Sequence, residues 1–377
     1  MSEITVRPYE PRDQEQTWHV RAMTYNDGRP IPVEEQVYKT ATPFVGEVDG
    51  KIVGTFVIMD MTVSRGVQAA WKTGGIAGVA VLPEARQSGV GSAMMRWSLR
   101  YMRDHGYTLA ALYPFRQSYY RRFGYETCGL RVKVTCPNSR LPKIRAELPL
   151  RMLTPEQHGE IRGCYDAFAK ARAGMNLREP FHWDRVIGNR TTVYAAGSPV
   201  EAYALVEHDW QFWIDQPISE IAWTTVRGYE ALLSLFGSIG INKSSVSWCE
   251  PADGLMLARY DDQGVTYESE KPVMYRVLDF PGALTQVTAA DYGEFTVAID
   301  DPDLPDNNGP WQVVFGKGKT EVRRSGAAEL TLDHLAAVQA LLGQPSLDDL
   351  VRNGRAPSIE AARRLLPPLP VCCMDYF

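Results

Sequence analysis

The sequence has few of the residues that build disulfide scaffolds or zinc sites. It contains 6 cysteines and 6 histidines among 377 residues, with no Cys-x-x-Cys and no His-x-x-x-His pair. Cysteines this sparse do not make a disulfide framework, and the common zinc signatures need such paired spacings. We therefore expect neither a disulfide scaffold nor a bound metal.

Long apolar runs and an excess of basic charge are also missing. Apolar runs such as 202–206 and 109–113 are far shorter than the ~20 residues of a membrane-spanning helix. A net charge of -5 does not suit a nucleic-acid-binding domain, which is normally basic. The first seven residues mix acidic and basic side chains where a signal peptide would be apolar. We expect a cytoplasmic protein that binds neither membrane nor nucleic acid.

What the chain does contain is material for ordinary hydrophobic cores. Hydrophobic residues make up 45% and charged residues 23% of the sequence, which excludes a disordered chain. At roughly 100–200 residues per domain, the length predicts two or three domains.

The first 130 residues predict a compact α/β unit. Asp49-Gly50 between two β-branched and aromatic runs is a strong hairpin signal. Within 67–81, Gly74-Gly75 predicts a break in the strand and Gly78 a turn or bulge. The strand, helix, strand order that follows favours a parallel pair with a right-handed crossover. The expected elements are strands at 4–7, 44–48, 51–59, 67–81, 108–113 and from 125, and helices at 11–25, 89–105 and 117–122.

The middle of the chain, from 151 to 274, echoes this unit. Residues 193–206 have the strand, turn, strand form of residues 45–58. They are followed by a strand at 220–224, a helix at 229–239 and a strand at 245–248, the same order as before. We expect a degenerate second copy of the same fold.

The last hundred residues differ in character. Strands at 295–299 and 311–315 flank an aspartate-rich turn, and helices are expected at 332–342 behind a Thr331 cap and at 359–366 behind a Ser358 cap. Three prolines between 367 and 370 then prevent further helix, so the chain should end in an extended tail.

The most informative segment lies between the strand that ends near Leu82 and the helix that follows. Gly89 and Gly91 would let backbone N–H groups point outward at a helix N-terminus, where the helix dipole favours an anion. The pattern is neither the Gly-x-x-x-x-Gly-Lys-Ser/Thr loop nor the three-glycine dinucleotide motif. From spacing alone, two interpretations stay open: a phosphate cradle, or a tight turn that needs glycine.

Together with a second motif, this segment resembles the GNAT acetyltransferase superfamily. Arg86-x-x-Gly89-x-Gly91 follows Val-Ala-Val and precedes Tyr120-Arg-Arg-Phe-Gly-Tyr125. In that family the first motif wraps the pyrophosphate of acetyl-coenzyme A (acetyl-CoA), and the strand before it binds the pantetheine through its backbone. The resemblance implies acetyl-CoA as cosubstrate, bound by Val79, Ala80, Val81, Arg86, Gln87, Ser88, Gly89, Val90, Gly91, Ser92, Phe115 and Arg116.

Over its whole length the chain is similar to the Eis-type (enhanced intracellular survival) N-acetyltransferases. The resemblance implies an α/β (α+β) fold of a catalytic GNAT domain at 1–135, a degenerate GNAT-like domain at 136–276 and a sterol-carrier-like α+β domain at 277–377. It also implies a homo-oligomer, with a hexamer suggested. The implied acceptor is a primary amine: an aminoglycoside, a polyamine or a lysine side chain.

Acetyl transfer needs a base for the amine and an acid for the departing thiolate. The resemblance assigns the acid to Tyr120 and the base to the chain's own terminal carboxylate, here on Phe377. Tyr119 and Tyr125 are rivals for the acid, and simple packing is another interpretation of Tyr120. A chain end is usually frayed and without function. Here the proline-stiffened apolar tail, with Phe377 as an anchor, favours a catalytic terminus.

Two further features have alternative interpretations. The four aspartates between Asp300 and Asp306 form either a solvated loop or part of an anionic pocket for a polycationic amine. Sterol-carrier-like folds elsewhere enclose lipids, so a lipid-binding or structural protein is the alternative function. The resemblance implies instead that this domain delivers Phe377 to the active site.

Overall fold

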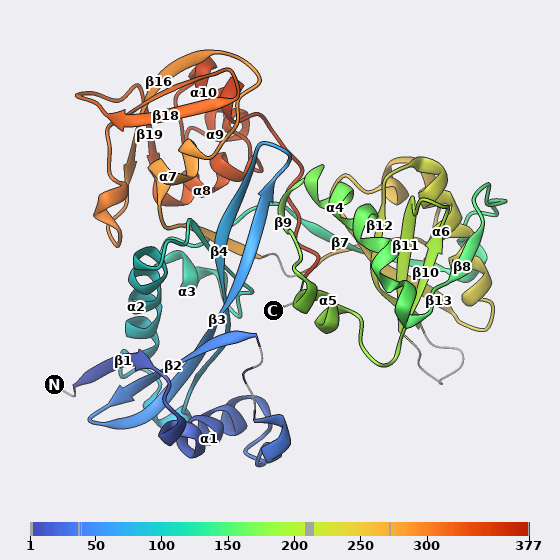
Figure 1. Cartoon of the computed structure of the whole chain (residues 1–377), viewed down its shortest axis with the longest axis horizontal. Coiled ribbons are helices and arrows are strands. Elements are labelled where there is room, and N and C mark those ends of the chain that lie inside the picture. Colours follow the sequence, from blue (N-terminus) through green and yellow to red (C-terminus); the bar gives the residue numbers. More distant parts are fainter. Residues whose placement is uncertain (1–2, 37, 39, 208–214, 271–272, 376) are drawn as a thin grey trace.

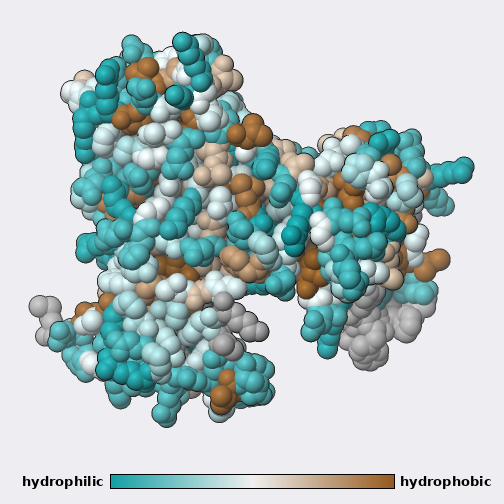
Figure 2. Space-filling view, in the orientation of Figure 1, coloured by the Kyte–Doolittle hydropathy of each residue, from teal (hydrophilic) through white to brown (hydrophobic). Residues whose placement is uncertain are grey.

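Among the residues that the structure describes, the strands form three sheets of eight, seven and four strands, which define a first, a second and a third domain. In Figure 1 the C-terminus lies near the middle of the molecule, between the first domain and the second, and Figure 2 shows a notch between these two domains. This mixed α/β fold confirms the predicted fold class. Within the described part of the chain, every helix is too short or too polar to cross a membrane. The computed structural model describes residues 3–36, 38, 40–207, 215–270, 273–375 and 377.

The first sheet has the strand order β1-β2-β3-β4-β5-β15-β6, and β9 pairs with the end of β3. Asp49-Gly50 joins β2 to β3 with both residues in the left-handed region, which confirms the predicted hairpin. The strands are β1 (Ile4–Pro8), β2 (Ala41–Val48), β3 (Lys51–Arg65), β4 (Ala69–Val81), β5 (Leu109–Leu112), β6 (Glu126–Thr127), β9 (Ala173–Asn176) and β15 (Met274–Val277). The helices are α1 (Gln14–Tyr25), α2 (Val90–Asp104) and α3 (Gln117–Arg121).

β4 continues through Gly74 and Gly75, so the predicted break there is wrong. Glycine at these positions permits close packing instead. A Cβ on Gly74 would collide with Met102 of α2, and one on Gly75 would lie 2.7 Å from the sulfur of Met61. Gly78 has a positive φ, and the register between β4 and β3 shifts beside it, which confirms the predicted bulge.

β4 and β5 are parallel neighbours, as the strand, helix, strand order predicted. Their pairing runs from Thr73 opposite Leu109 to Ile76 opposite Leu112. β5 ends at that point, whereas β4 continues to Val81 and stays paired with β3 on its other side. The two strands therefore part beyond Ile76, and the last residues of β4 have no β5 backbone beside them.

The second domain repeats this plan, as predicted. A hairpin of β10 and β11 leads to β12, then α6, then β13, and β12 and β13 are parallel like β4 and β5. The strand order is β14-β7-β13-β12-β11-β10-β8. The strands are β7 (Arg131–Pro137), β8 (Leu150–Met152), β10 (Thr191–Ala196), β11 (Ala202–Glu207), β12 (Asp215–Trp223), β13 (Ser245–Pro251) and β14 (Thr266–Ser269); the helices are α4 (Arg162–Lys170), α5 (Pro180–Val186) and α6 (Val226–Ile239).

Each of these two sheets receives a strand from a distant part of the chain. β7 follows the first domain in sequence but pairs with β13 in the second sheet, and β15 follows the second domain but lies between β5 and β6 in the first. The division into 1–135, 136–276 and 277–377 stays a prediction, and both of its boundaries fall inside these exchanged strands.

The third sheet has the order β18-β17-β16-β19. The predicted cap at Thr331 is wrong, because Thr331 lies in β19 and the Asp333 carboxylate caps α8 by accepting a hydrogen bond from the N–H of Ala336. α10 begins at Glu360 without the side-chain cap predicted at Ser358. The elements are α7 (Phe280–Thr285), β16 (Gly293–Asp300), β17 (Trp311–Gly316), β18 (Lys319–Arg324), β19 (Leu330–Asp333), α8 (His334–Leu342), α9 (Leu347–Arg352) and α10 (Glu360–Leu365).

The aspartate-rich turn after β16 attaches the third domain to the first. Asp301 is 1% exposed and pairs with Arg276 of β15 at 2.5 Å. The next two carboxylates along the turn, Asp303 and Asp306, pair with Arg96 and Arg103 of α2. Asp300 and Asp306 are exposed, as a solvated loop predicts, whereas the buried Asp301 corrects that interpretation at one position. The pairing of Asp301, Asp303 and Asp306 with arginines speaks against a free anionic pocket.

Candidate active site

The glycine turn before α2 has the geometry of an anion site. Gln87 and Gly89 both adopt positive φ, and Gly89 is the N-cap of α2 at a φ of 98°. The N–H of Val90 donates to the Ser88 hydroxyl at 3.3 Å. The remaining N–H groups of the first helical turn have no acceptor within the helix, and they point away from its end. This local geometry fits an anion as well as it fits a tight turn.

The end of β4 borders the same turn. Val79 lies beside the bulge, and its carbonyl accepts a hydrogen bond from the hydroxyl of Tyr25, at the end of α1, at 2.8 Å. Arg86, on the surface, donates from Nε to the carbonyl of Val81 at 3.4 Å. Ala80 is buried between these two residues. The structure therefore brings this strand segment and the glycine turn together.

An aromatic cluster lies at α3, which follows β5 in the chain. Phe115 is 74% exposed, and its ring centroid lies 5.4 Å from those of both Tyr119 and Tyr120. Arg116 is the N-cap of α3. Tyr119 reaches the glycine turn, because its hydroxyl lies 3.0 Å from where a Cβ on Gly91 would be. The cluster therefore connects α3 to the start of α2.

The three candidate tyrosines have different surroundings. Tyr120 is 3% exposed, its hydroxyl donates no hydrogen bond to another described residue, and burial raises its pKa. Tyr125 lies in the core, where its hydroxyl has no partner among the described residues and burial again raises the pKa. Tyr120 and Tyr125 are both buried in the same core cluster, so burial alone does not decide between them. The hydroxyl of Tyr119 lies over Gly91, at the start of α2.

The end of the chain lies where β4 and β5 part. The Phe377 ring packs on Tyr113, which follows β5, with centroids 5.3 Å apart. It also covers Gly75, where a Cβ would lie 3.0 Å from Cδ2 of the ring. Gly75 pairs with Ala111, one residue before the last rung of the β4 and β5 pairing. The anchoring role predicted for Phe377 is therefore consistent with its packing on Gly75. The sequence analysis had interpreted this glycine as a strand break.

A small pocket adjoins Phe377 at the junction of the domains. It is bordered by Met61 of β3, by Asn176 and His182 of the β9 to α5 region, and by Asp375 of the tail. Burial lowers the pKa of His182, so its neutral form is favoured. The sequence analysis singled out none of these four residues, because they come from segments far apart in the chain.

In the described part of the second domain, the corresponding helix start offers no comparable anion site. At the N-terminus of α6, the Glu201 carboxylate accepts hydrogen bonds from the Thr225 hydroxyl at 2.7 Å and from Nε of Arg227 at 2.9 Å. A Cβ on Gly228 would lie 2.9 Å from the Glu201 carbonyl oxygen. The chain's own groups therefore fill the position that an external anion would take.

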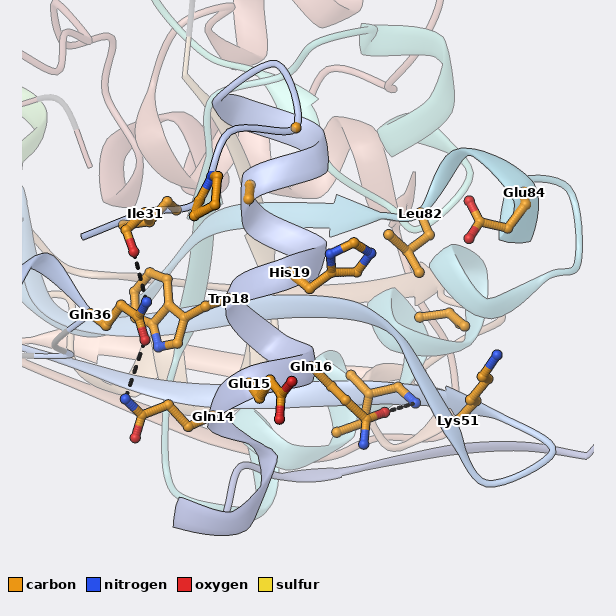
Figure 3. Close-up of a pocket in the computed structure, with 15 residues that line it drawn as sticks. Gln14, Glu15, Gln16, Trp18, His19, Ile31, Gln36, Lys51, Leu82 and Glu84 are labelled. Atoms are coloured by element: carbon orange, nitrogen blue, oxygen red, sulfur yellow. Dashed lines mark hydrogen bonds between the residues drawn. The ribbon is translucent and has the colours of Figure 1, made fainter. Parts of the chain in front are cut away.

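A separate groove of about 850 Å³ lies beside α1 (Figure 3). Its polar lining includes His19, Lys51 and Glu84. Gln36 closes one side by accepting a hydrogen bond from Gln14 and donating one to the carbonyl of Ile31. The groove contains neither the glycine turn nor the aromatic cluster, so we do not assign the chemistry to it.

Two family models match parts of this chain. Residues 5–128 match the model described as an acetyltransferase (GNAT) domain, and residues 280–374 match that of a sterol carrier protein domain. The first range contains the glycine turn and the aromatic cluster. The second contains the third sheet and all but the last three residues of the tail.

Individual proteins match over nearly the whole chain. The N-acetyltransferase Eis of Mycobacterium tuberculosis is 25% identical over 363 residues, which cover 89% of this chain and 86% of that protein. The crystal structure of a GCN5-related N-acetyltransferase from Anabaena variabilis superposes with a TM-score of 0.88 at 18% identity, over 100% of both chains. Eis1 from Mycobacterium abscessus superposes with a TM-score of 0.78 at 17% identity, again over 100% of both. These two structures share the three-domain fold.

Proposed function

Because the chain is an acetyl-CoA-dependent N-acetyltransferase of the GNAT superfamily, of Eis type and with a sterol-carrier-like C-terminal domain, we propose that it acetylates a primary amine. Two groups of the protein transfer the protons in this proposal. Tyr120 is the general acid and the terminal carboxylate of Phe377 is the general base. The observation that carries this proposal is the contact of Phe377 with Gly75 and Tyr113, at the separation of β4 and β5.

The residues around the glycine turn fit acetyl-CoA. The first turn of α2 offers backbone donors to a pyrophosphate, and Gly89 and Gly91 keep side chains out of its way. The backbone of Val79 to Val81 is free of β5 and suits the extended pantetheine. Arg86 and Arg116 are exposed, and in this proposal their guanidinium groups pair with phosphates of the cosubstrate. Acetyl-CoA supplies the activated acetyl thioester at this site.

In this proposal Phe377 and Tyr120 each carry one of the two proton transfers. The Phe377 carboxylate accepts a proton from the amine as the new C–N bond forms. Tyr120 donates its phenolic proton to the coenzyme sulfur as the C–S bond breaks. Burial raises the pKa of Tyr120, so at neutral pH the phenol is protonated and can donate its proton when the C–S bond breaks.

The acceptor that we propose is a primary amine of the aminoglycoside, polyamine or lysine side-chain class. The anionic terminal carboxylate attracts the ammonium group of the substrate, and the carboxylate then accepts a proton from it. Coenzyme release measured across a panel of these amines tests the proposal, and a failure to acetylate any primary amine would contradict it. Assembly into a homo-oligomer stays a prediction.

The alternative function, lipid binding by the third domain, has less support. Every residue of α8 from Ala336 to Leu342 is buried, so side chains of the domain's own core occupy the helix surface. The domain continues directly into the extended tail. We therefore assign this domain the delivery of Phe377.

We expect Gly89→Val to weaken acetyl-CoA binding by at least about tenfold, because a β-branched residue resists a φ of 98° and would distort the turn that presents the backbone N–H groups. Calorimetric titration with acetyl-CoA measures the loss. Gly106→Val is the matched control: Gly106 also has a positive φ, but it lies at the opposite end of α2 with no atom within 4 Å of an added Cβ. Unchanged affinity in a folded Gly89→Val protein would remove the assignment.

Gly75→Ala should lower kcat about tenfold, because the new methyl group would displace the Phe377 ring, and the KM for acetyl-CoA should stay constant. Steady-state kinetics at saturating amine give both constants. Gly74→Ala is the control, since its Cβ would collide with Met102 of α2 and crowd the core without touching the tail. Equal losses of kcat in the two variants would argue against a role for the Phe377 contact.

A further inference from the structure

Asp375, two residues before the chain end, is held inside the second domain. Its side chain is 7% exposed, and Oδ1 accepts a hydrogen bond from Nε of Arg178 at 2.8 Å. The hydroxyl of Tyr165 is shared between the Asn176 carbonyl, at 2.7 Å, and Oδ2 of Asp375, at 3.2 Å. Arg178 lies between β9 and α5, and Tyr165 lies on α4. Two elements of the second domain therefore grip one carboxylate of the tail.

Arg178 is itself fixed from the opposite side. Its two terminal nitrogens donate to the two carboxylate oxygens of Glu220 on β12, and the Nη1 to Oε1 distance is 2.8 Å. The hydroxyl of Tyr203 also donates to Glu220, at 2.6 Å. The Arg178 side chain is 0% exposed, and the paired hydrogen bonds to Glu220 fix the orientation of its guanidinium group. Because Arg178 is held by Glu220, its hydrogen bond to Asp375 fixes the position of that carboxylate.

The tail backbone is held at the same residue. The Tyr113 hydroxyl, in the first domain, donates to the Asp375 carbonyl at 2.5 Å. Upstream, Val371 of the tail forms a bridge with Ala173. Cys372 and Met374 pack into the core of the second domain, whereas Val371 and Cys373 pack into a core that the third domain shares with the first. The ring of Tyr113 meanwhile contacts Phe377.

We propose that Arg178 and Asp375 are positioning residues, which hold the tail so that the carboxylate of Phe377 reaches the substrate amine. The inference rests on the proposed function and extends it, because it gives the degenerate domain a task in catalysis. Two extended residues span at most roughly 7 Å, so fixing Asp375 confines the chain end to a small volume.

A stability role explains this cluster less well. Burying an ion pair costs desolvation that its attraction barely offsets, and hydrophobic replacements are often as stable. What a buried guanidinium fork supplies is a defined direction and distance. A chain end without such a hold would fray, and catalysis requires placement to a fraction of an ångström.

The test begins with Asp375→Ala and Asp375→Asn. We expect Asp375→Ala to lower kcat by about 10²-fold at an unchanged KM for acetyl-CoA, the effect of a displaced catalytic group. Asp375→Asn keeps an acceptor oxygen for Nε of Arg178 and should recover part of that loss. Glu250→Gln is the control for removing a buried carboxylate of the second domain: Glu250 is bound by Tyr229 and Trp248, and we expect its kcat to stay at the wild-type value.

A double variant separates this inference from the proposal beneath it. In a chain extended beyond Phe377, which lacks the terminal carboxylate, Asp375→Ala should cause no further loss of the residual rate, because nothing is left to position. Asp375→Ala with wild-type kcat, beside an inactive extended chain, would overturn the positioning role alone. An extended chain with full activity would overturn the proposed base. Equal losses of kcat in Asp375→Ala and Glu250→Gln would make the effect structural and also overturn the inference.

Discussion

Extending the chain beyond Phe377 should reduce acetyl transfer by about 10²–10⁴-fold, the usual contribution of a positioned base, while acetyl-CoA still binds. The extension replaces the terminal carboxylate with a neutral amide. Deleting Phe377 should be as damaging, because the carboxylate moves by up to ~3.3–3.6 Å and the ring that covers Gly75 is lost.

Three proteins measured side by side distinguish a catalytic chain end from a packing one. Phe377→Leu keeps the carboxylate and loses only the ring contact with Tyr113, so it should retain most of its kcat. The deletion and a C-terminal tag should both be nearly inactive, and an N-terminal tag serves as the control. Full activity in the C-terminally tagged protein would exclude the terminal carboxylate as the base. The base would then be an internal Asp or Glu near Tyr120.

Local patterns in the sequence predicted the elements around the site well. Asp49-Gly50 forms its hairpin, Gly78 its bulge, and α2 begins at Val90 directly after the glycine turn. These features depend on backbone conformations that few residues other than glycine adopt readily, so they are visible in a single segment. The resemblance to a known family then supplied roles that spacing alone left open.

Gly74 and Gly75 are where local reasoning failed. Two adjacent glycines within a strand pattern usually mark a bend, yet β4 is continuous because each glycine makes room for a partner on one face of the sheet. Gly74 accommodates Met102, and Gly75 accommodates Met61 together with Phe377. The last of these partners lies about three hundred residues away in sequence, and no local pattern announces it.

The exchanged strands and the tail contacts escaped prediction for the same reason. β15 lies beside β5, although more than 160 residues separate them, and Arg178 meets Asp375 across 197 positions. Arginine at one end of a helix and aspartate near a chain end are ordinary surface residues in a sequence. Only the fold makes them buried partners.

Tyr120→Phe should lower kcat by about 10²–10⁴-fold, because it removes the one proton that the departing sulfur needs. The KM for acetyl-CoA should change little, since the ring still packs against Phe115 and Tyr119. Burial raises the pKa of Tyr120 above its usual value, so the wild-type phenol stays protonated as the pH rises through the neutral range. The deficit of the variant should therefore be constant over that range.

Matched variants at the rival tyrosines decide whether this assignment is right. Tyr119→Phe loses a hydroxyl that lies over Gly91, so its effect should fall on acetyl-CoA binding rather than on kcat. Tyr125→Phe loses a hydroxyl without a partner in the core, and removing an unsatisfied buried group should leave kcat intact and stability equal or higher. If Tyr120→Phe turned over at the wild-type rate while either rival lost kcat, the acid would be the rival. The three hydroxyls have different surroundings: that of Tyr119 lies over Gly91, that of Tyr125 has no partner among the described residues, and Tyr120 lies in a ring cluster with Phe115 and Tyr119.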